Sequence, residues 1–321
     1  MNQSHKAPLL RIVRRQSILN WHGWLIRAIG LFLALAVSAI VIYSVVHLNP
    51  LKIYAAMFKG NFGSPNRVWI TLRDMMMLLC IGLGLAPAFK MRFWNIGAEG
   101  QILVGGIATA AIMIYLGNSF PTWMLLLISV AASCLAGALW GMIPAVFKAR
   151  FGTNEVLFTL MMNYVAIQLT SYFVAVWENP FGSNTVGIIN QQTKAGWFPA
   201  ILDQKYLLNV IIVMTLTVLM YIYLRYSKQG YEIAVVGESE RTARYIGINV
   251  NKTIVRTMMI SGAVCGLAGY IAVAGASHTI STNTAGGSGF TAIIVAWLAK
   301  FNPFMMIFVT ALLVFMEKGS I

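Results

Sequence analysis

Long apolar runs separated by short polar stretches extend along most of the chain, and most charged residues fall in the polar stretches. A charge at the centre of a helix in lipid costs about 2.5 to 3.5 kcal/mol, and about 20 apolar residues cross a bilayer as a helix. The charge-poor runs therefore predict nine membrane segments: Ala28–Leu51, Val68–Phe89, two halves of Gln101–Phe147, Val156–Trp177, Tyr206–Leu224, two parts of Thr257–Ala299, and Pro303–Met316.

Two of these runs are too long for one crossing and contain helix-breaking residues. Gly117–Pro121 divides the first run into two helices. The polar, glycine-rich stretch Ser277–Gly289 divides the second run and leaves an apolar remainder that is too short to span comfortably. This predicts a broken or re-entrant helix, which lipid tolerates only where it faces protein or a cavity. A flexible hairpin is the alternative.

The composition agrees with this pattern. The chain is 59% hydrophobic and 10% charged, with a mean hydropathy of +0.75. A soluble domain could not bury so much apolar surface. We therefore predict an all-α polytopic membrane protein.

The basic residues predict the orientation, because Lys and Arg are retained on the cytoplasmic side during insertion. A cytoplasmic N-terminus divides the chain into a basic segment, residues 1–27, and a transmembrane domain, residues 28–321. Of the 23 Lys and Arg residues, only seven then lie outside: Lys52, Lys59, Arg67, Arg73, Lys194, Lys205 and Lys318. The net charge of +14 thus indicates topology, and no nucleic-acid partner is expected.

The sequence lacks the motifs of catalysis. It has no nucleophile elbow, no zinc spacing and no phosphate-binding P-loop. Cys80, Cys134 and Cys265 lie in apolar runs without a CxxC pair, which is typical of core thiols. An enzyme is therefore not expected, and any ATP-driven mechanism would need an ATPase on another chain.

Glycines one helical turn apart predict close helix packing. The pairs are Gly137–Gly141 and Gly262–Gly266, and Gly269 follows the second. Small residues at this spacing allow two helix backbones to approach each other.

A carboxylate occurs at an unusual place in the stretch Met91–Gln101. Glu99 stands between Gly97 and Gly100, where a helix should enter the membrane. Glycines loosen a helix, and free backbone groups at lipid depth must face protein or a water-filled cavity. The alternative is a solvated glutamate at the interface, since interfacial charges are inexpensive.

A second polar feature begins at Gly152. Thr153 or Asn154 can cap a helix, and Glu155 would then sit at the positive end of its dipole. The residues Glu155, Thr159, Asn163, Ala166 and Thr170 fall close to one line of that helix. Such a face can line a pathway or form interhelical hydrogen bonds. Asn163 favours the first interpretation, because it is mid-span and cannot bond its own backbone.

The longest polar connection, residues 225–256, contains a short amphipathic pattern. Ser239 can cap a helix with an acidic first turn that ends at Gly247. Because a helix this short buries little surface alone, it is expected to have a partner surface. The alternative is a solvated connection of mixed charge.

Three motifs in order carry a family resemblance: NIGAEGQ at Asn95–Gln101, GTNEVLFTLMMNY at Gly152–Tyr164, and AxxxGIxV at Ala243–Val250. They resemble the permease subunits of bacterial ATP-binding cassette importers, in the group of ribose and branched-chain amino-acid permeases. Within this group they are most similar to nucleoside permeases served by a purine-nucleoside-binding lipoprotein. The resemblance extends from about Val68 onward.

The resemblance implies a subunit of the bacterial plasma membrane that pairs with a second permease, docks cytoplasmic ATPase subunits and receives substrate from an extracellular lipoprotein. ATP and Mg would be bound by the ATPase, so no cofactor is expected in this chain. Ala243, Gly247 and Ile248 match the coupling helix that contacts the ATPase, and Glu238, Glu240 and Arg241 belong to the same segment.

The resemblance also implies a substrate pathway. The matched positions are Asn95, Glu99, Gln101, Asn154, Glu155 and Asn163. Amide and carboxylate groups could bond the ribose hydroxyls and the base edge, and Trp94 and Tyr164 are candidates to stack on the base. Ribose-like sugars or branched-chain amino acids are alternative substrates, and a proton-coupled secondary transporter using Glu99 or Glu155 is an alternative mechanism.

The chain departs from the family pattern at two places. Trp94 stands where the family more often has Phe, and the sequence stops at Ile321 where family members continue into a further helix. The resemblance therefore predicts nine to ten helices, with the last one apparently missing.

Overall fold

The computed structural model describes residues 20–319, so most of the basic segment 1–27 lies outside the described residues. The described secondary structure is helical apart from one isolated bridge between Ile201 and Gln204. The chain forms two compact units, Met1–Phe58 and Lys59–Ile321. The all-helical prediction is confirmed.

The first unit contains a broken helix. α1 (Asn20–Val41) continues into a π-helical turn, Ile42–Val46, and α2 (Pro50–Phe62) starts after it. The predicted segment Ala28–Leu51 is helical as far as Val46, and the helix breaks there because His47 adopts a left-handed conformation with φ of 55°. Pro50, which has no backbone N–H to continue a helix, then begins α2.

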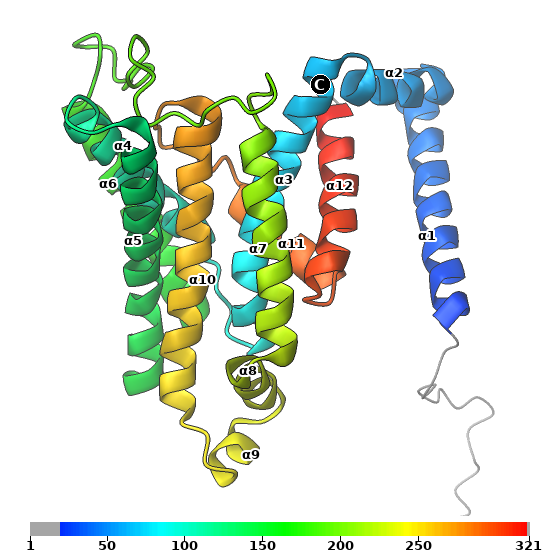
Figure 1. Cartoon of the computed structure of the whole chain (residues 1–321). Helices are drawn as coiled ribbons and strands as arrows, with labels where there is room; N and C mark the ends of the chain where they lie inside the picture. Colours follow the sequence, from blue (N-terminus) through cyan, green and yellow to red (C-terminus); the bar gives the residue numbers. More distant parts are fainter. Residues whose placement is uncertain (1–19, 320–321) are drawn as a thin grey trace, which may run out of the picture. The chain divides into compact units, whose positions relative to one another are not determined.

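The second unit is a bundle that holds the remaining helices (Figure 1). Their bounds are α3 (Pro65–Lys90), α4 (Ala98–Leu116), α5 (Thr122–Phe151), α6 (Glu155–Val176), α7 (Leu207–Tyr226), α8 (Lys228–Glu238), α9 (Glu240–Tyr245), α10 (Val250–Ala272) with a π-helical end at Val273–Ser277, α11 (Ser288–Leu298) and α12 (Pro303–Gly319). α8 and α9 lie at one end of this bundle.

Six helices of the described chain are long and apolar enough to cross a membrane: α3, α4, α5, α6, α7 and α10 with its π-helical end. A seventh span results if Phe32–Val45 and Pro50–Phe62, which are bent by 114°, count as one. The predicted number of nine is not confirmed, because α11 has 11 residues and α12 has 17. A helix rises about 1.5 Å per residue, so α11 is about 16 Å long.

Local capping explains several helix boundaries. Ser64 accepts a hydrogen bond from the Arg67 backbone N–H, and Pro65 follows at the first helical position of α3. Asn154 caps α6, as predicted for either Thr153 or Asn154, by accepting from the Val156 and Leu157 N–H groups. Gly152 ends α5 with a φ of 65°.

α10 is the most buried candidate span, and it packs against α3, α4 and α5. The close helix packing predicted at the glycine pairs is present, and it joins α5 to α10. A Cβ atom built on Gly262 would lie 2.2 Å from the Gly137 carbonyl oxygen, and one on Gly137 would lie 2.2 Å from the Gly262 carbonyl oxygen. The two backbones are therefore in direct contact, and a methyl group on either glycine would separate them.

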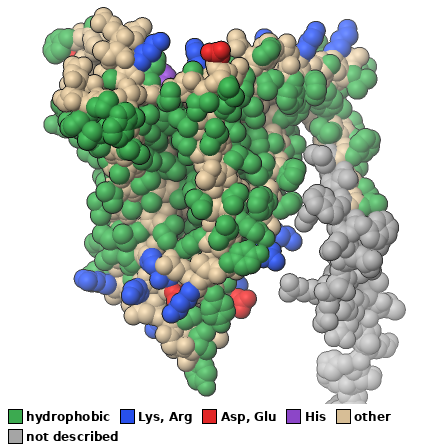
Figure 2. Space-filling model, in the orientation of Figure 1, with side chains coloured by type: hydrophobic (Ala, Val, Ile, Leu, Met, Phe, Trp, Pro, Cys, Tyr) green, Lys and Arg blue, Asp and Glu red, His purple; other side chains and the backbone are tan. Residues whose placement is uncertain are grey.

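The surface of the bundle has the pattern of a membrane protein. Figure 2 shows hydrophobic side chains over its middle, with Lys and Arg side chains toward the two ends. The large exposed hydrophobic residues include Leu135 and Leu139 on α5 and Met161 on α6. An exposed apolar belt of this kind is stable only in contact with lipid or another protein.

Candidate functional site

Polar side chains gather where the chain passes from α3 to α4. Residues 91–97 form an irregular segment between these two helices. Asn95 is fully buried, and its amide nitrogen donates to Ser261 Oγ of α10 at 3.1 Å and to Gln101 Oε1 at 3.3 Å. Its Oδ1 accepts from the Gly97 N–H at 3.0 Å. Asn95 and Gln101 therefore hold the start of α4 against α10.

α6 supplies the hydrogen-bond partners of the same irregular backbone. Asn163 Oδ1 accepts from the Gly100 N–H at 2.8 Å, and its amide nitrogen donates to the Ile96 carbonyl at 2.9 Å. Thr159 Oγ1 accepts from the Ile96 N–H at 3.2 Å. The polar face predicted on α6 is thus present and buried against α4, and its interhelical hydrogen bonds satisfy a non-helical segment.

Glu99 connects the starts of two helices. It lies in the first turn of α4, is 8% exposed, and its Oε1 accepts from the Gly289 N–H of α11 at 2.8 Å. The first N–H groups of a helix have no partner within the helix and carry partial positive charge. A carboxylate at this place accepts a hydrogen bond from such an N–H group and also carries the opposite charge. Glu99 is therefore buried with a partner and is not the solvated interfacial residue that was the alternative.

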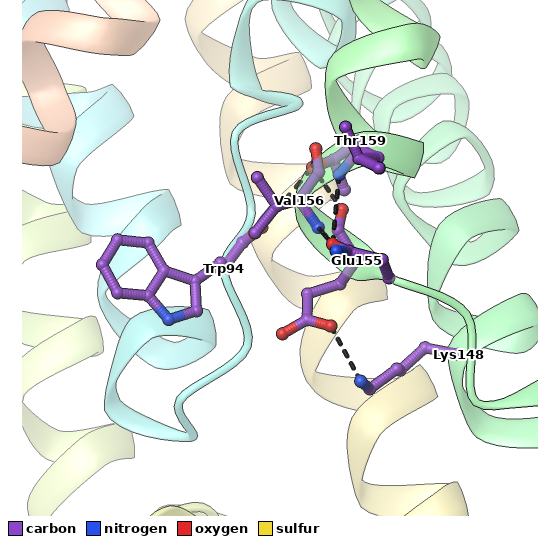
Figure 3. Close-up of polar contacts among 7 residues, drawn as sticks. Trp94, Lys148, Glu155, Val156 and Thr159 are labelled. Atoms are coloured by element: carbon purple, nitrogen blue, oxygen red, sulfur yellow. Dashed lines mark hydrogen bonds and ion pairs between the residues drawn. The ribbon is translucent and has the colours of Figure 1, made fainter.

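Glu155 belongs to a separate ion pair at the start of α6 (Figure 3). Its Oε2 lies 2.8 Å from Lys148 Nζ of α5, and the two side chains are 16% and 29% exposed. In Figure 3 the Trp94 ring points away from this pair. Glu155 therefore fastens α5 to α6 beside the polar junction formed by Asn95, Glu99, Gln101 and Asn163.

An aromatic cluster lies next to the junction. The Trp94 and Trp297 rings are 5.4 Å apart at 30°, and Phe89 meets both rings edge to face at 5.8 and 6.0 Å. Trp94 and Trp297 are 44% and 45% exposed. Sequence reasoning missed Trp297. The sequence feature that could have identified it is the spacing of Phe290, Ile294 and Trp297. This spacing places three exposed residues on one face of α11.

Two predicted pathway residues do not join this group. Tyr164 is 64% exposed on α6 next to the buried Asn163, and so it lies on a different face of the helix. Asn154 is exposed and its side chain caps α6.

The segment between α7 and α10 forms the predicted compact helix. Ser239 Oγ accepts from the Thr242 N–H at 3.2 Å and caps α9. The helix ends before Gly247, which has a φ of 86°, and the Ile248 N–H donates to the Ala243 carbonyl at 2.9 Å. This is the cap geometry that a glycine favours at the end of a helix.

α9 has one buried and one exposed side. Ala243 is fully buried in an apolar cluster with Ile233, Val250 and Ile254. Tyr245 is 92% exposed and Ile246 is 49% exposed. The charged residues Glu238, Glu240 and Arg241 are exposed, and Glu240 lies 3.7 Å from Arg244. An apolar pair at the tip of a charged helix is a surface that can dock on another protein.

Within residues 20–319 no group of three metal-ligating side chains occurs. The three cysteines are free thiols: Cys80 and Cys265 are buried, as expected for core residues, whereas Cys134 is partly exposed. The junction can donate and accept hydrogen bonds, and the neighbouring tryptophans offer flat apolar surface. This combination suits the recognition of a polar solute with an aromatic or sugar ring.

Comparison with known proteins gives a family match. Residues 68–321 match the family described as "Branched-chain amino acid transport system / permease component". No solved structure matches the chain significantly.

Three curated relatives are similar over most of their lengths. The guanosine ABC transporter permease protein NupP of Bacillus subtilis is 32% identical over 92% of this chain and 85% of its own length. The nucleoside ABC transporter permease protein NupB of Lactococcus lactis is 28% identical, over 85% and 77%. The glucose ABC transporter permease protein TsgB13 of Haloferax volcanii is 27% identical, over 91% and 78%.

The chain also resembles a second permease from one of these organisms. The guanosine ABC transporter permease protein NupQ of Bacillus subtilis is 25% identical over 70% of this chain and 72% of its own length. Relatives of this chain therefore occur as permease pairs.

Proposed function

The chain belongs to the permease component family of branched-chain amino acid transport systems, and we propose that it is the membrane-spanning permease of an ATP-binding cassette importer for nucleosides. The observation that carries the proposal is the similarity to NupP along 92% of the chain. NupB, named as a nucleoside permease, supports the same substrate class.

In this proposal the nucleoside passes the polar junction. Asn95, Gln101 and Asn163 are engaged with the backbone and with each other, so they shape the passage. Trp94 and Trp297 present exposed ring surface on which a base can stack. Glu99 sits at the start of α11, where a small movement of that helix would release its carboxylate toward a ribose hydroxyl.

The ATPase of the importer docks on α9 and supplies ATP and Mg binding. Tyr245 and Ile246 form the exposed tip of this docking surface. Closure of the ATPase dimer displaces α9 and rocks this permease against a second permease, which gives alternating access to an extracellular lipoprotein. The pairing of NupP with NupQ supports the second permease.

The membrane topology follows from the same proposal. The end of the bundle that holds α8 and α9 faces the cytoplasm, as does the N-terminus. The turn from α11 to α12 lies at this same end, next to Lys90 and Arg225, and α12 runs back toward the start of α3, where Lys318 pairs with Asp74. Counting α11 and α12 as two further crossings would bring the six long helices and the bent pair to nine segments. Lys90, Arg150 and Arg225 support this orientation because they end α3, α5 and α7 on the cytoplasmic side.

Sugar uptake by the same mechanism is a second candidate, because TsgB13 is named as a glucose permease. The test is ATP hydrolysis by the complex reconstituted with its ATPase, second permease and lipoprotein. We expect stimulation by guanosine or adenosine. Stimulation by glucose or ribose alone would favour the second candidate, and stimulation by leucine alone would favour amino-acid uptake. Uptake without an ATPase would refute both and leave a proton-coupled transporter.

A further inference from the structure

A basic cavity opens at the end of the bundle that holds α8 and α9. Its volume is about 440 Å³, and it lies between the ends of α3 and α7, α8, and the turn from α11 to α12. Lys90, Arg225 and Lys300 line it, and no Asp or Glu side chain does. This cavity is separate from the junction around Asn95 and from the tip of α9.

The three cations lack acidic partners. The ion pairs among the described residues involve Asp74, Glu155, Glu232 and Glu240, and none of them includes Lys90, Arg225 or Lys300. Lys90 is half-buried and Arg225 and Lys300 are exposed, and like charges that face one cavity repel each other. An anion bound in the cavity would offset this repulsion.

Other groups add positive potential and hydrogen-bond donors. Asn302 and Pro303 line the cavity, so the N-terminus of α12 with its partial positive charge borders it. Lys90 already donates to the Leu224 carbonyl at 3.1 Å, which fixes its ammonium group at the wall. Arg225 is held over the Tyr221 ring at 5.8 Å, with Nη1 3.0 Å from the Tyr221 hydroxyl.

The position and lining of the cavity indicate what it takes. It lies where α3 and α7 end, which is the level of the lipid headgroups if these helices span the bilayer. Tyr221, Tyr231 and Phe301 line it, and aromatic side chains are typical of this level. Basic cavities between membrane helices on the cytoplasmic side bind phosphate headgroups. We infer that this cavity binds a phosphate group, such as that of an anionic phospholipid.

Lys and Arg residues that only set the membrane orientation would not need to surround one cavity, as Lys90, Arg225 and Lys300 do. Lys228 and Lys252 lie at the same end of the bundle and are exposed, yet they line a different cavity. They provide the same topological signal without facing Lys90, Arg225 or Lys300. A variant of Lys252 is therefore a matched control for loss of one positive charge.

The test uses the purified full-length chain in neutral detergent. Its thermal unfolding temperature is measured against increasing dioctanoyl phosphatidylglycerol, dioctanoyl phosphatidylcholine and inorganic phosphate. We expect phosphatidylglycerol to raise the temperature saturably and phosphatidylcholine to have no comparable effect. If inorganic phosphate reproduces the rise at similar concentration, the ligand is a free anion rather than a lipid.

Charge removal decides whether this cavity is the site. Lys300→Gln should raise the half-saturating concentration about fivefold, on the order expected for one charge near a lipid phosphate, and Arg225→Gln should do the same. Lys252→Gln should leave it unchanged, and Lys300→Arg should retain binding. A saturable rise that is unaltered in Lys300→Gln and Arg225→Gln, or an equal rise with phosphatidylcholine, would overturn the inference. So would the absence of any rise.

Discussion

The Glu99 carboxylate and the Gly289 backbone N–H are 2.8 Å apart, although 190 positions separate them in the chain. The bond joins the first turn of α4 to the first turn of α11. A Cβ atom built on Gly289 would lie 2.9 Å from the Glu99 backbone nitrogen, so the two helix starts are also in close contact. The short helix α11 thus begins inside the bundle, with its first turn in contact with the Glu99 carboxylate.

Replacement of Glu99 tests this contact. Glu99→Gln keeps an acceptor oxygen but loses the charge, and Glu99→Leu leaves the Gly289 N–H unpaired, which costs about 1 to 3 kcal/mol. We expect stability to fall from the wild type to Glu99→Gln and further to Glu99→Leu, because charge-assisted hydrogen bonds are the stronger ones. The measurement is thermal unfolding in detergent. Glu238→Gln removes an exposed charge from the surface and controls for charge removal. Equal stability of Glu99→Leu and wild type would contradict the prediction.

Asn163 should be a major stabilising residue of the bundle. Asn163→Leu leaves both the Gly100 N–H and the Ile96 carbonyl without this partner, at about 1 to 3 kcal/mol for each buried group. Reaction of the buried Cys80 and Cys265 with a thiol dye during heating reports unfolding. We expect the variant to react at lower temperature. Gln168→Leu, which removes an exposed amide from the same helix, should react as the wild type does.

Gly247 is expected to matter for coupling more than for stability. Its φ is 86° and a Cβ atom would meet nothing within 4 Å, so Gly247→Ala adds only the strain of a left-handed residue, roughly 1 to 2 kcal/mol. This strain should distort the end of α9 and reduce nucleoside-stimulated ATP hydrolysis in the reconstituted complex. The unfolding temperature should change by only a few degrees.

Gly182→Ala is the matched control for this substitution. Gly182 has a φ of 82° and equally open surroundings, in a loop between α6 and α7. If both variants reduce hydrolysis equally, the effect of Gly247→Ala does not come from α9.

Trp297 and Tyr164 are two exposed aromatic residues that a nucleoside assay can separate. Stacking of a base on an aromatic ring contributes about 1 to 3 kcal/mol. Trp297→Ala should therefore raise the guanosine concentration for half-maximal ATPase stimulation at least fivefold, while Trp297→Phe should raise it less. Tyr164→Ala should have little effect, because Tyr164 lies outside the cluster. A larger effect of Tyr164→Ala than of Trp297→Ala would instead indicate that the base stacks on α6.

His278 predicts a dependence of stability on pH. Its ring stacks on Trp197 with centroids 3.8 Å apart and planes 4° apart, and burial lowers the pKa of His278 below 6.5. As pH falls through 6.5, the unfolded chain binds a proton at this residue that the folded chain does not bind, so folding stability is lost. The stabilisation is fully present above that pH.

The measurement is the unfolding temperature between pH 7.5 and pH 5. His278→Phe keeps a ring on Trp197 and removes the titration, so the pH-dependent loss should be smaller in this variant. An unchanged pH profile would show that other groups are responsible.

Local features of the fold were predictable because their causes are local. Asn154 and Ser239 cap helices within three residues, and Gly247 ends α9 through its own backbone conformation. Close helix packing at Gly137 and at Gly262 was also expected from their spacing, whereas their contact with each other became visible only in the structure.

The partners of the polar residues could not be predicted. The sequence showed that Asn163 lies on a polar face of α6. The hydrogen bonds of Asn163 to the Ile96 carbonyl and the Gly100 N–H could not be predicted, because they depend on how α4 and α6 pack. Glu99 could be identified as unusual, whereas Gly289 could not be assigned to it. Trp297 was overlooked because a tryptophan in a short apolar run is equally compatible with contact to lipid.

The shortness of α11 has a consequence for the barrier that the membrane presents. α11 ends at Leu298, just before Lys300, and a helix of 11 residues is about 16 Å long. If Lys300 lies at the edge of a hydrocarbon layer of about 30 Å, the start of α11 beside Glu99 would lie about halfway through that layer. A hydrophilic molecule that reached this depth would find a carboxylate and a helix dipole in place of hydrocarbon, and the thickness of low-dielectric material left to cross would be roughly half that of the bilayer.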